Sequence, residues 1–243
     1  MRDYLRLSRT QSYSLLFALP LLLMYEVGAW MISGGRSGMR NGADVLLRAL
    51  LATGGVQGTL AFTAVLVVIG AVLVAMERRK KPVPLRATVF GGMLLESAAY
   101  AMIFGAVVGT VTQWMLGGVA GRLAADPGSR LPVGDQVVLS LGAGIYEELL
   151  FRVLLVGGLV WALRAIGMSR RNSAVASALG AAFLFSAFHY IGPYAYPLEL
   201  QSFLFRFLAG LAFSGLFLAR GFGVAAWTHA LYDVFLVVMR GGG

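Results

Sequence analysis

Long apolar runs separated by short polar segments dominate the chain. A helix that crosses the hydrocarbon core of a bilayer needs about 20 mostly apolar residues, and several runs reach or approach that length. They are residues 13–33, 57–76, 88–118, 137–163, 174–191, 200–219 and 222–239. The pattern predicts an all-α, polytopic membrane bundle of about seven to eight spanning helices, built as a single integral membrane domain over residues 1–243.

Two stretches leave the number of helices open. The run 88–118 is long for one simple span, and the stretch 42–53 is apolar but short. An eighth helix or a re-entrant piece could lie in either place. The first run follows Arg2, Arg6 and Arg9, as in a signal peptide, but its length and the many runs after it indicate that it is retained.

The composition supports a membrane protein over a soluble one. Hydrophobic residues make up 58% of the chain and charged residues only 13%, whereas a soluble domain has about 25% charged residues. The net charge of +9 comes from short basic clusters between apolar runs, so we expect no nucleic-acid partner. The absence of cysteine excludes disulfides, thiolate metal sites and a cysteine nucleophile.

The basic residues predict the orientation. If the N-terminus is cytoplasmic, twice as many of them fall in inner segments as in outer ones, as the positive-inside rule requires. The inner ones are Arg2, Arg6, Arg9, Arg78, Arg79, Lys80, Lys81, Arg86, Arg164, Arg170, Arg171 and Arg220, and the outer ones are Arg36, Arg40, Arg48, Arg122, Arg130 and Arg240. The strong preference for arginine over lysine is typical of GC-rich bacterial genomes, so we expect a multi-pass protein of the bacterial inner membrane.

Ionisable groups inside membrane spans are costly and are therefore functional candidates. The run 137–163 contains Glu147, Glu148 and Arg152. Glu148 and Arg152 are four residues apart on one helix face, which predicts a buried ion pair. Glu147 points about 100° away from Glu148 around the helix and is expected to face a different neighbour. Glu26 and Glu96 stand alone in their runs, so we expect packing or lining contacts for them.

Both histidines of the chain fall in predicted spans. His229 and Asp233 are four residues apart, so imidazole and carboxylate share a helix face. His189 comes from a third run. At a rise of about 1.5 Å per residue, Glu147 lies about 15 Å from the outer end of its run and His229 about 11 Å from the inner end of its own. These groups can therefore meet between the midplane and the outer leaflet. A single buried histidine or acid is often only a structural hydrogen-bond partner, but several on three helices favour a functional site.

Three motifs follow one another on consecutive runs: EExxxR at 147–152, FxxxH at 185–189 and HxxxD at 229–233. In this order and spacing they resemble the CPBP family of intramembrane proteases, which includes CAAX prenyl endopeptidases, myxosortase-like enzymes and proteins linked to bacteriocin processing and immunity. The resemblance covers residues 147–233 and implies a catalytic core in the helices of about 137–239. The first half of the chain matches the family only in hydropathy. The last family motif ends in Asn or Asp, and here it ends in Asp233.

The resemblance implies an endopeptidase that hydrolyses a peptide bond of a membrane-anchored protein or peptide with a glutamate-activated water. Glu147 then corresponds to the general base, His189 holds and polarises the water, and His229 with Asp233 faces the scissile carbonyl. A buried carboxylate is a better base than one in water, and an imidazole can donate to a developing oxyanion. An ionised aspartate cannot donate there. We therefore expect Asp233 to orient His229 and favour its imidazolium form.

Glu148 and Arg152 are supporting residues in this interpretation, and no metal or other cofactor is favoured. Two histidines and two carboxylates would suffice for Zn²⁺, and a metal-dependent enzyme would use Glu147, His189, His229 and Asp233. Neither histidine, however, has the HExxH spacing of zinc proteases.

Two other functions fit the same residues. A proton- or ion-coupled transporter would use an intramembrane cluster of acids and histidines as a relay, although we find no inverted repeat with broken helices in the sequence. A non-catalytic immunity or scaffold member of the same family would keep the fold without the reaction. For the protease and for both alternatives, we expect the protein to contact the lipid bilayer.

Overall fold

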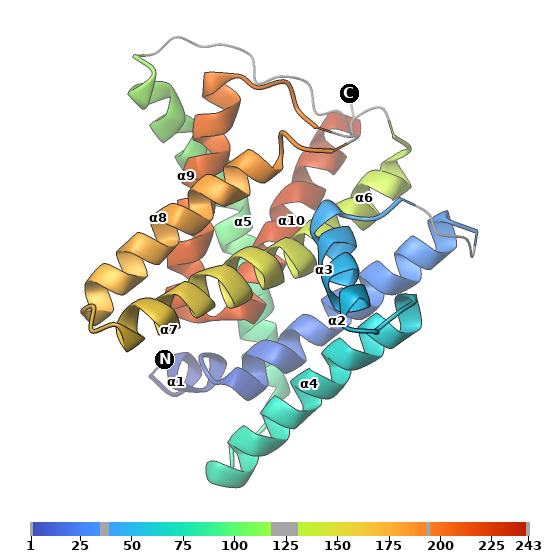
Figure 1. Ribbon diagram of the computed structural model, residues 1–243, viewed down its shortest axis with the longest axis vertical. Helices are drawn as coiled ribbons and strands as arrows, with labels where there is room; N and C mark the ends of the chain where they lie inside the picture. Colours follow the sequence, from blue (N-terminus) through green and yellow to red (C-terminus); the bar gives the residue numbers. More distant parts are fainter. Residues whose placement is uncertain (1, 35–38, 118–130, 193–194, 242–243) are drawn as a thin grey trace.

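The computed structural model describes residues 2–34, 39–117, 131–192 and 195–241 (Figure 1). Within these ranges every regular element is a helix, which confirms the all-α fold class. The α-helices are α1 (Arg2–Ser8), α2 (Gln11–Ile32), α3 (Gly42–Thr53), α4 (Thr59–Lys80), α5 (Ala87–Met115), α6 (Val133–Gly142), α7 (Gly157–Ala165), α8 (Arg170–Phe188), α9 (Leu200–Arg220) and α10 (Phe222–Gly241). Two π-helical segments, η2 (Ala143–Glu147) and η3 (Leu149–Val156), join α6 to α7.

In the part of the chain that the structure describes, five helices are long and apolar enough to span a membrane: α2, α4, α5, α9 and α10. They correspond to five of the seven predicted runs, and the protein is an integral membrane protein with a polytopic helical bundle. The run 88–118 forms one long helix, α5, and the stretch 42–53 forms the separate short helix α3. The remaining two runs correspond to the segment from α6 to α7, which the π-helical turns interrupt, and to α8.

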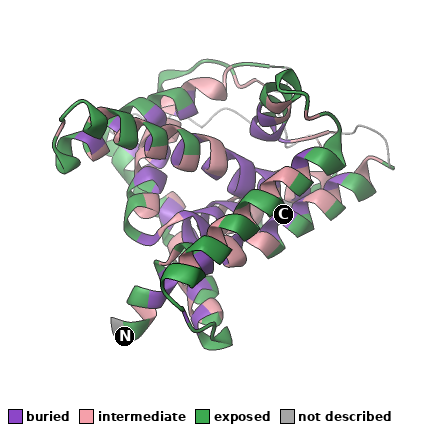
Figure 2. Ribbon diagram, turned by 60° about the horizontal axis from the view of Figure 1, so that its bottom comes forward, coloured by how far each residue is buried: buried purple, intermediate pink, exposed green. Residues whose placement is uncertain are grey.

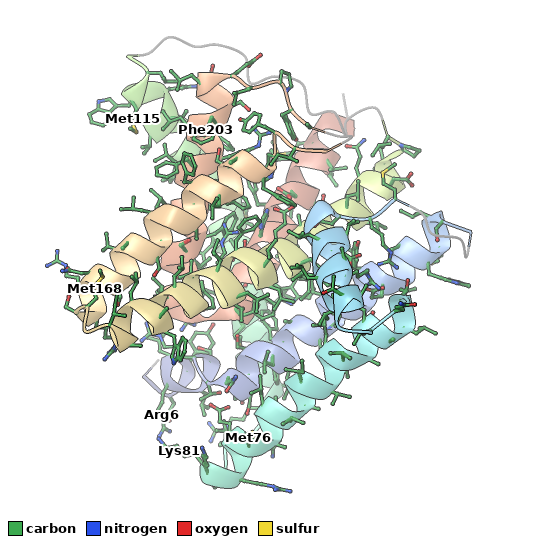
Figure 3. All side chains as sticks on the ribbon, in the orientation of Figure 1. Arg6, Met76, Lys81, Met115, Met168 and Phe203 are labelled. Atoms are coloured by element: carbon green, nitrogen blue, oxygen red, sulfur yellow. The ribbon has the colours of Figure 1, made fainter. Side chains whose placement is uncertain are left out.

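Several basic residues lie in the last turns of helices. Arg6 and Lys81 lie toward the lower end in Figure 3, Met115 and Phe203 lie toward the upper end, and Met168 lies at the left edge between them. Of the basic residues assigned to the inner side of the membrane, Arg78, Arg79 and Lys80 lie in the last turn of α4, Arg164 lies in that of α7 and Arg220 in that of α9. Of the residues assigned to the outer side, Arg36, Arg122 and Arg130 lie outside the described residues, as does the side chain of Arg240. The side chain of Arg2, which is assigned to the inner side, is also outside the described part.

Helix α10 is the central element, because it packs against α2, α5, α6, η2 and α9. Buried residues gather where the helices cross, and exposed ones cover the outward faces (Figure 2). Many exposed side chains are large and apolar, including Leu60, Leu95, Met102 and Trp161. Such a surface is stable facing lipid chains and would be unfavourable in water.

Glycines permit the closest helix crossings. A Cβ atom on Gly144 would lie 2.5 Å from the carbonyl oxygen of Ala226 and 2.5 Å from the Cβ of Ala230, so only glycine lets η2 approach α10 this closely. Gly105 meets the ring of Tyr232 in the same way. Gly109, the second glycine of its GxxxG pattern, has open space around it and makes no such contact.

The two acids that stand alone in their runs both have charged partners in the fold. Glu96 of α5 accepts two hydrogen bonds of 2.6 Å from Arg220 and one of 2.5 Å from Tyr4, which joins α1, α5 and α9. Glu26 of α2 accepts hydrogen bonds from Arg48 at 2.7 Å and from Tyr146 at 2.5 Å. The sequence predicts packing or lining contacts for both acids, whereas in the structure each of them forms an ion pair with an arginine.

Candidate active site

The EExxxR segment lies on π-helical backbone. Segment η2 ends at Glu147, and η3 begins at Leu149 and includes Arg152. Single π-helical turns are rare and often occur at functional sites, because the wider turn changes where side chains point. Glu147 and Glu148 are both buried, and they contact different neighbours. The two adjacent carboxylates are thus both held inside the bundle rather than one facing lipid.

Glu148 bridges an arginine and a histidine. Its Oε1 atom lies 3.1 Å from Nη1 of Arg152 and 2.8 Å from Nδ1 of His229. The side chains of Glu148 and Arg152 are almost completely buried. The expected pair between these two residues is therefore present in the structure, and it has a third member from α10.

An aromatic cage surrounds the guanidinium of Arg152. Its central carbon lies 4.4 Å from the ring centre of Phe185 and 5.3 Å from that of Phe213. Within the described residues, none of its three side-chain nitrogens has a hydrogen-bond partner. The positive charge is therefore balanced by Glu148 and by the faces of the rings, and cation–π contacts of this kind are strongest where water is excluded.

His229 is held on three sides. Besides the contact of Nδ1 with Glu148, its Nε2 atom lies 3.5 Å from Oδ2 of Asp233, and its ring stacks on Phe213 at 4.5 Å between centroids. The shorter and more direct contact is the one with Glu148. The sequence predicts that Asp233 orients His229, and the structure adds a second carboxylate, Glu148, which lies beside Nδ1 and comes from another helix.

Glu147 and His189 face each other across a short gap. The Oε2 atom of Glu147 lies 4.0 Å from Nε2 of His189. The Nδ1 atom of His189 lies 2.8 Å from the carbonyl oxygen of Phe185. Because a carbonyl oxygen only accepts, Nδ1 carries a proton and Nε2 is the atom presented to Glu147.

His189 lies at a helix end rather than inside a span. The run 174–191 predicts a helix through His189, but α8 ends at Phe188 and His189 is its C-terminal cap. The chain turns there because the backbone N–H groups of the next residues bond back to α8, including that of Tyr190 to Ala187 at 3.1 Å. The imidazole is therefore carried at the C-terminal end of α8, where the chain leaves the helix.

Asn41 is a site residue that the motifs do not contain. Its Nδ2 atom donates a 2.8 Å hydrogen bond to Oε1 of Glu147, and Asn41 is buried. Its Oδ1 accepts from the backbone N–H of Ala43 and so caps α3. An asparagine before a short apolar helix is a recognisable N-cap signal. The cap could have been found in the sequence, but its partner 106 residues away could not.

Among the four residues expected for a metal-dependent enzyme, Glu147 lies 4.0 Å from His189 and His229 lies 3.5 Å from Asp233. In residues 2–34, 39–117, 131–192 and 195–241, no group of three or more histidines and acids is arranged to hold a metal ion. Both ring nitrogens of His229 face carboxylates. The donor set as arranged does not fit a shared ion.

Residues 129–235 match a family model described as type II CAAX prenyl endopeptidase Rce1-like. The matched segment contains all three motifs and confirms the resemblance that the motifs indicate. Asn41 and α1 to α5 lie before it. Comparison with curated proteins and with solved structures found no match.

Proposed function

We propose that this chain, whose residues 129–235 carry a domain of the Rce1-like family of type II CAAX prenyl endopeptidases, is an intramembrane endopeptidase that uses a glutamate-activated water. The family is a protease family, which supports a membrane protease in general. The mechanism rests on one observation: Glu147 and His189 face each other 4.0 Å apart inside the bundle. The catalytic core is formed by helices over about 137–239, and the preceding helices support it.

The gap between Glu147 and His189 suits a nucleophilic water. A distance of 4.0 Å between Oε2 and Nε2 is too long for a direct hydrogen bond. A water between them can donate one proton to the carboxylate and the other to the imidazole nitrogen, which leaves its lone pairs free for attack. Glu147 then takes the proton as the water oxygen bonds to the scissile carbonyl carbon.

His229 supplies the donor for the developing oxyanion. Its Nδ1 proton is bound to Glu148, and carboxylates beside both ring nitrogens favour the protonated imidazolium. Nε2–H can then donate to the carbonyl oxygen of the substrate as negative charge builds on it. When the tetrahedral intermediate collapses, the carbon–nitrogen bond breaks and the proton held by Glu147 passes to the leaving amine.

The proposed substrate is a membrane-anchored protein or peptide. A lipid-modified or transmembrane tail would bring a peptide bond to the bundle within the bilayer. The proposed location is the bacterial inner membrane, with the N-terminus on the cytoplasmic side.

The test is cleavage of anchored peptides by the purified protein in lipid vesicles. Peptides with a prenylated tail or a transmembrane tail would carry a fluorescent reporter, and wild type would be compared with Glu147→Gln and His189→Ala. Removal of a general base is expected to lower the cleavage rate by about 10²- to 10⁴-fold. Glu199→Gln, at an exposed acid outside the site, is the matched control and should cleave normally. Cleavage that persists in both site variants would overturn the proposal.

A further inference from the structure

We infer that Asn41 is a positioning residue for Glu147: its amide holds one carboxylate oxygen so that the other faces His189. The inference rests on the proposed function and extends it to a part of the chain outside the 129–235 match. Asn41 does not touch the reacting atoms. It acts through the hydrogen bond of 2.8 Å from its Nδ2 to Oε1 of Glu147.

The orientation of the Asn41 amide follows from its two partners. Oδ1 accepts the backbone N–H of Ala43 at 2.9 Å, so the oxygen end of the amide is turned toward α3. The nitrogen end must then point to Glu147, where a carboxylate can only accept from it. With Oε1 occupied, Oε2 is the oxygen left opposite His189.

A buried network fixes Asn41 in place. Its backbone N–H donates to the hydroxyl of Tyr25 at 3.1 Å, and that hydroxyl donates to Asp44 at 2.9 Å. Arg40 binds the carboxylate of Asp44 at 2.8 Å, so the residues on both sides of Asn41 are held in place. A Cβ atom on Gly142 would lie 2.9 Å from the Cβ of Asn41, which shows how closely the residue fits against α6.

The bond to Asn41 has two consequences for a general base. A carboxylate with a donor on one oxygen cannot rotate freely, so the second oxygen keeps its direction toward the water site. A donor also favours the ionised form, which is the form that accepts a proton. The charged or titratable groups around Glu147 are His189 from the end of α8, His229 from α10, Arg152 from η3 and its neighbour Glu148. Asn41 is the neutral donor among them.

The variant Asn41→Ser separates the bond to Glu147 from the cap. Serine is also a good N-cap, but its side chain is too short to reach Glu147. We expect kcat at pH 7 to fall about 10-fold with KM nearly unchanged. The acidic limb of the pH–rate profile should move upward by about one pH unit, because the ionised carboxylate loses a hydrogen-bond donor. The melting temperature should stay close to that of wild type.

Two further variants complete the test. Asn41→Asp has the same shape and keeps the cap acceptor but cannot donate to Glu147, so it should shift the pH profile in the same direction and further. Ser169→Ala removes the N-cap of α8, which binds Asn172 far from Glu147, and should leave the pH profile unchanged. An unshifted profile in folded Asn41→Ser and Asn41→Asp would overturn the inference, whether or not the melting temperature falls.

An infrared titration of the Glu147 carboxyl band gives a readout that does not depend on cleavage. The band is assigned by its loss in Glu147→Gln, and its midpoint should move to higher pH in Asn41→Ser. If wild type cleaves no anchored peptide, the proposed function fails while this titration still decides the role of Asn41. If wild type cleaves and the midpoint does not move, only the inference about Asn41 fails.

Discussion

The Nδ1 atom of His229 and the Oε1 atom of Glu148 lie 2.8 Å apart, although 81 residues separate them in the chain. The same oxygen lies 3.1 Å from Nη1 of Arg152. One buried carboxylate thus balances an arginine from its own helix and orients a histidine from α10. Glu148 therefore has two roles, because it pairs with Arg152 and also holds His229. Substitution of Glu148 should consequently lower activity more than substitution of Asp233 does.

Glu148→Gln should impair both stability and activity. The substitution leaves Arg152 as an uncompensated buried charge and removes the carboxylate that favours the imidazolium of His229. Breaking a buried pair costs about 3–5 kcal/mol of unfolding free energy, and we expect kcat to fall about 100-fold. Thermal unfolding in detergent and peptide cleavage measure the two effects. A variant with normal stability and normal kcat would contradict the bridging role.

Asp233→Asn should have a smaller effect. The carboxylate of Asp233 lies 3.5 Å from Nε2 of His229, farther away than Glu148 lies from Nδ1. Losing its charge weakens the imidazolium without leaving a buried charge unpaired, so we expect kcat to fall about 10-fold and the melting temperature to change little. Full activity in this variant would show that Glu148 alone suffices to support His229.

Arg152→Lys should destabilise the bundle despite keeping the charge. The planar guanidinium lies over Phe185 and near Phe213, and a lysine ammonium cannot stack on these rings in the same way. We expect a loss of about 2 kcal/mol in unfolding free energy, measured by denaturation in detergent. Arg164→Lys is the matched control at an exposed position of α7. Equal stability of the two variants would argue against the aromatic cage.

Gly144→Ala should displace η2 from α10. The added methyl group would lie 2.5 Å from the carbonyl oxygen of Ala226, and backbone there cannot move aside. Overpacking of this kind costs about 1–3 kcal/mol, and the shift should also lower activity because η2 carries Glu147. Gly158→Ala is the matched control, since its Cβ would meet nothing within 4 Å. If both variants melt and cleave alike, close packing at Gly144 does not position the site.

The sequence by itself predicts the features that depend on local spacing and on the bilayer. The apolar runs indicate the helices because a span must satisfy its backbone hydrogen bonds internally and bury apolar side chains in lipid. The i, i+4 spacing of Glu148 with Arg152 and of His229 with Asp233 predicts contacts within one helix, and both occur in the structure. The motifs also indicate the family that matches residues 129–235.

The tertiary structure decided which helix faces meet. The contacts of Glu148 with His229 and of Asn41 with Glu147 join distant segments, and they depend on how η2 crosses α10 and where α3 is capped. The pattern of apolar residues also does not predict the π-helical turns or the end of α8 at Phe188. Helical periodicity fixes the direction of a side chain relative to its own helix, but the partner on the other side is set by packing between helices.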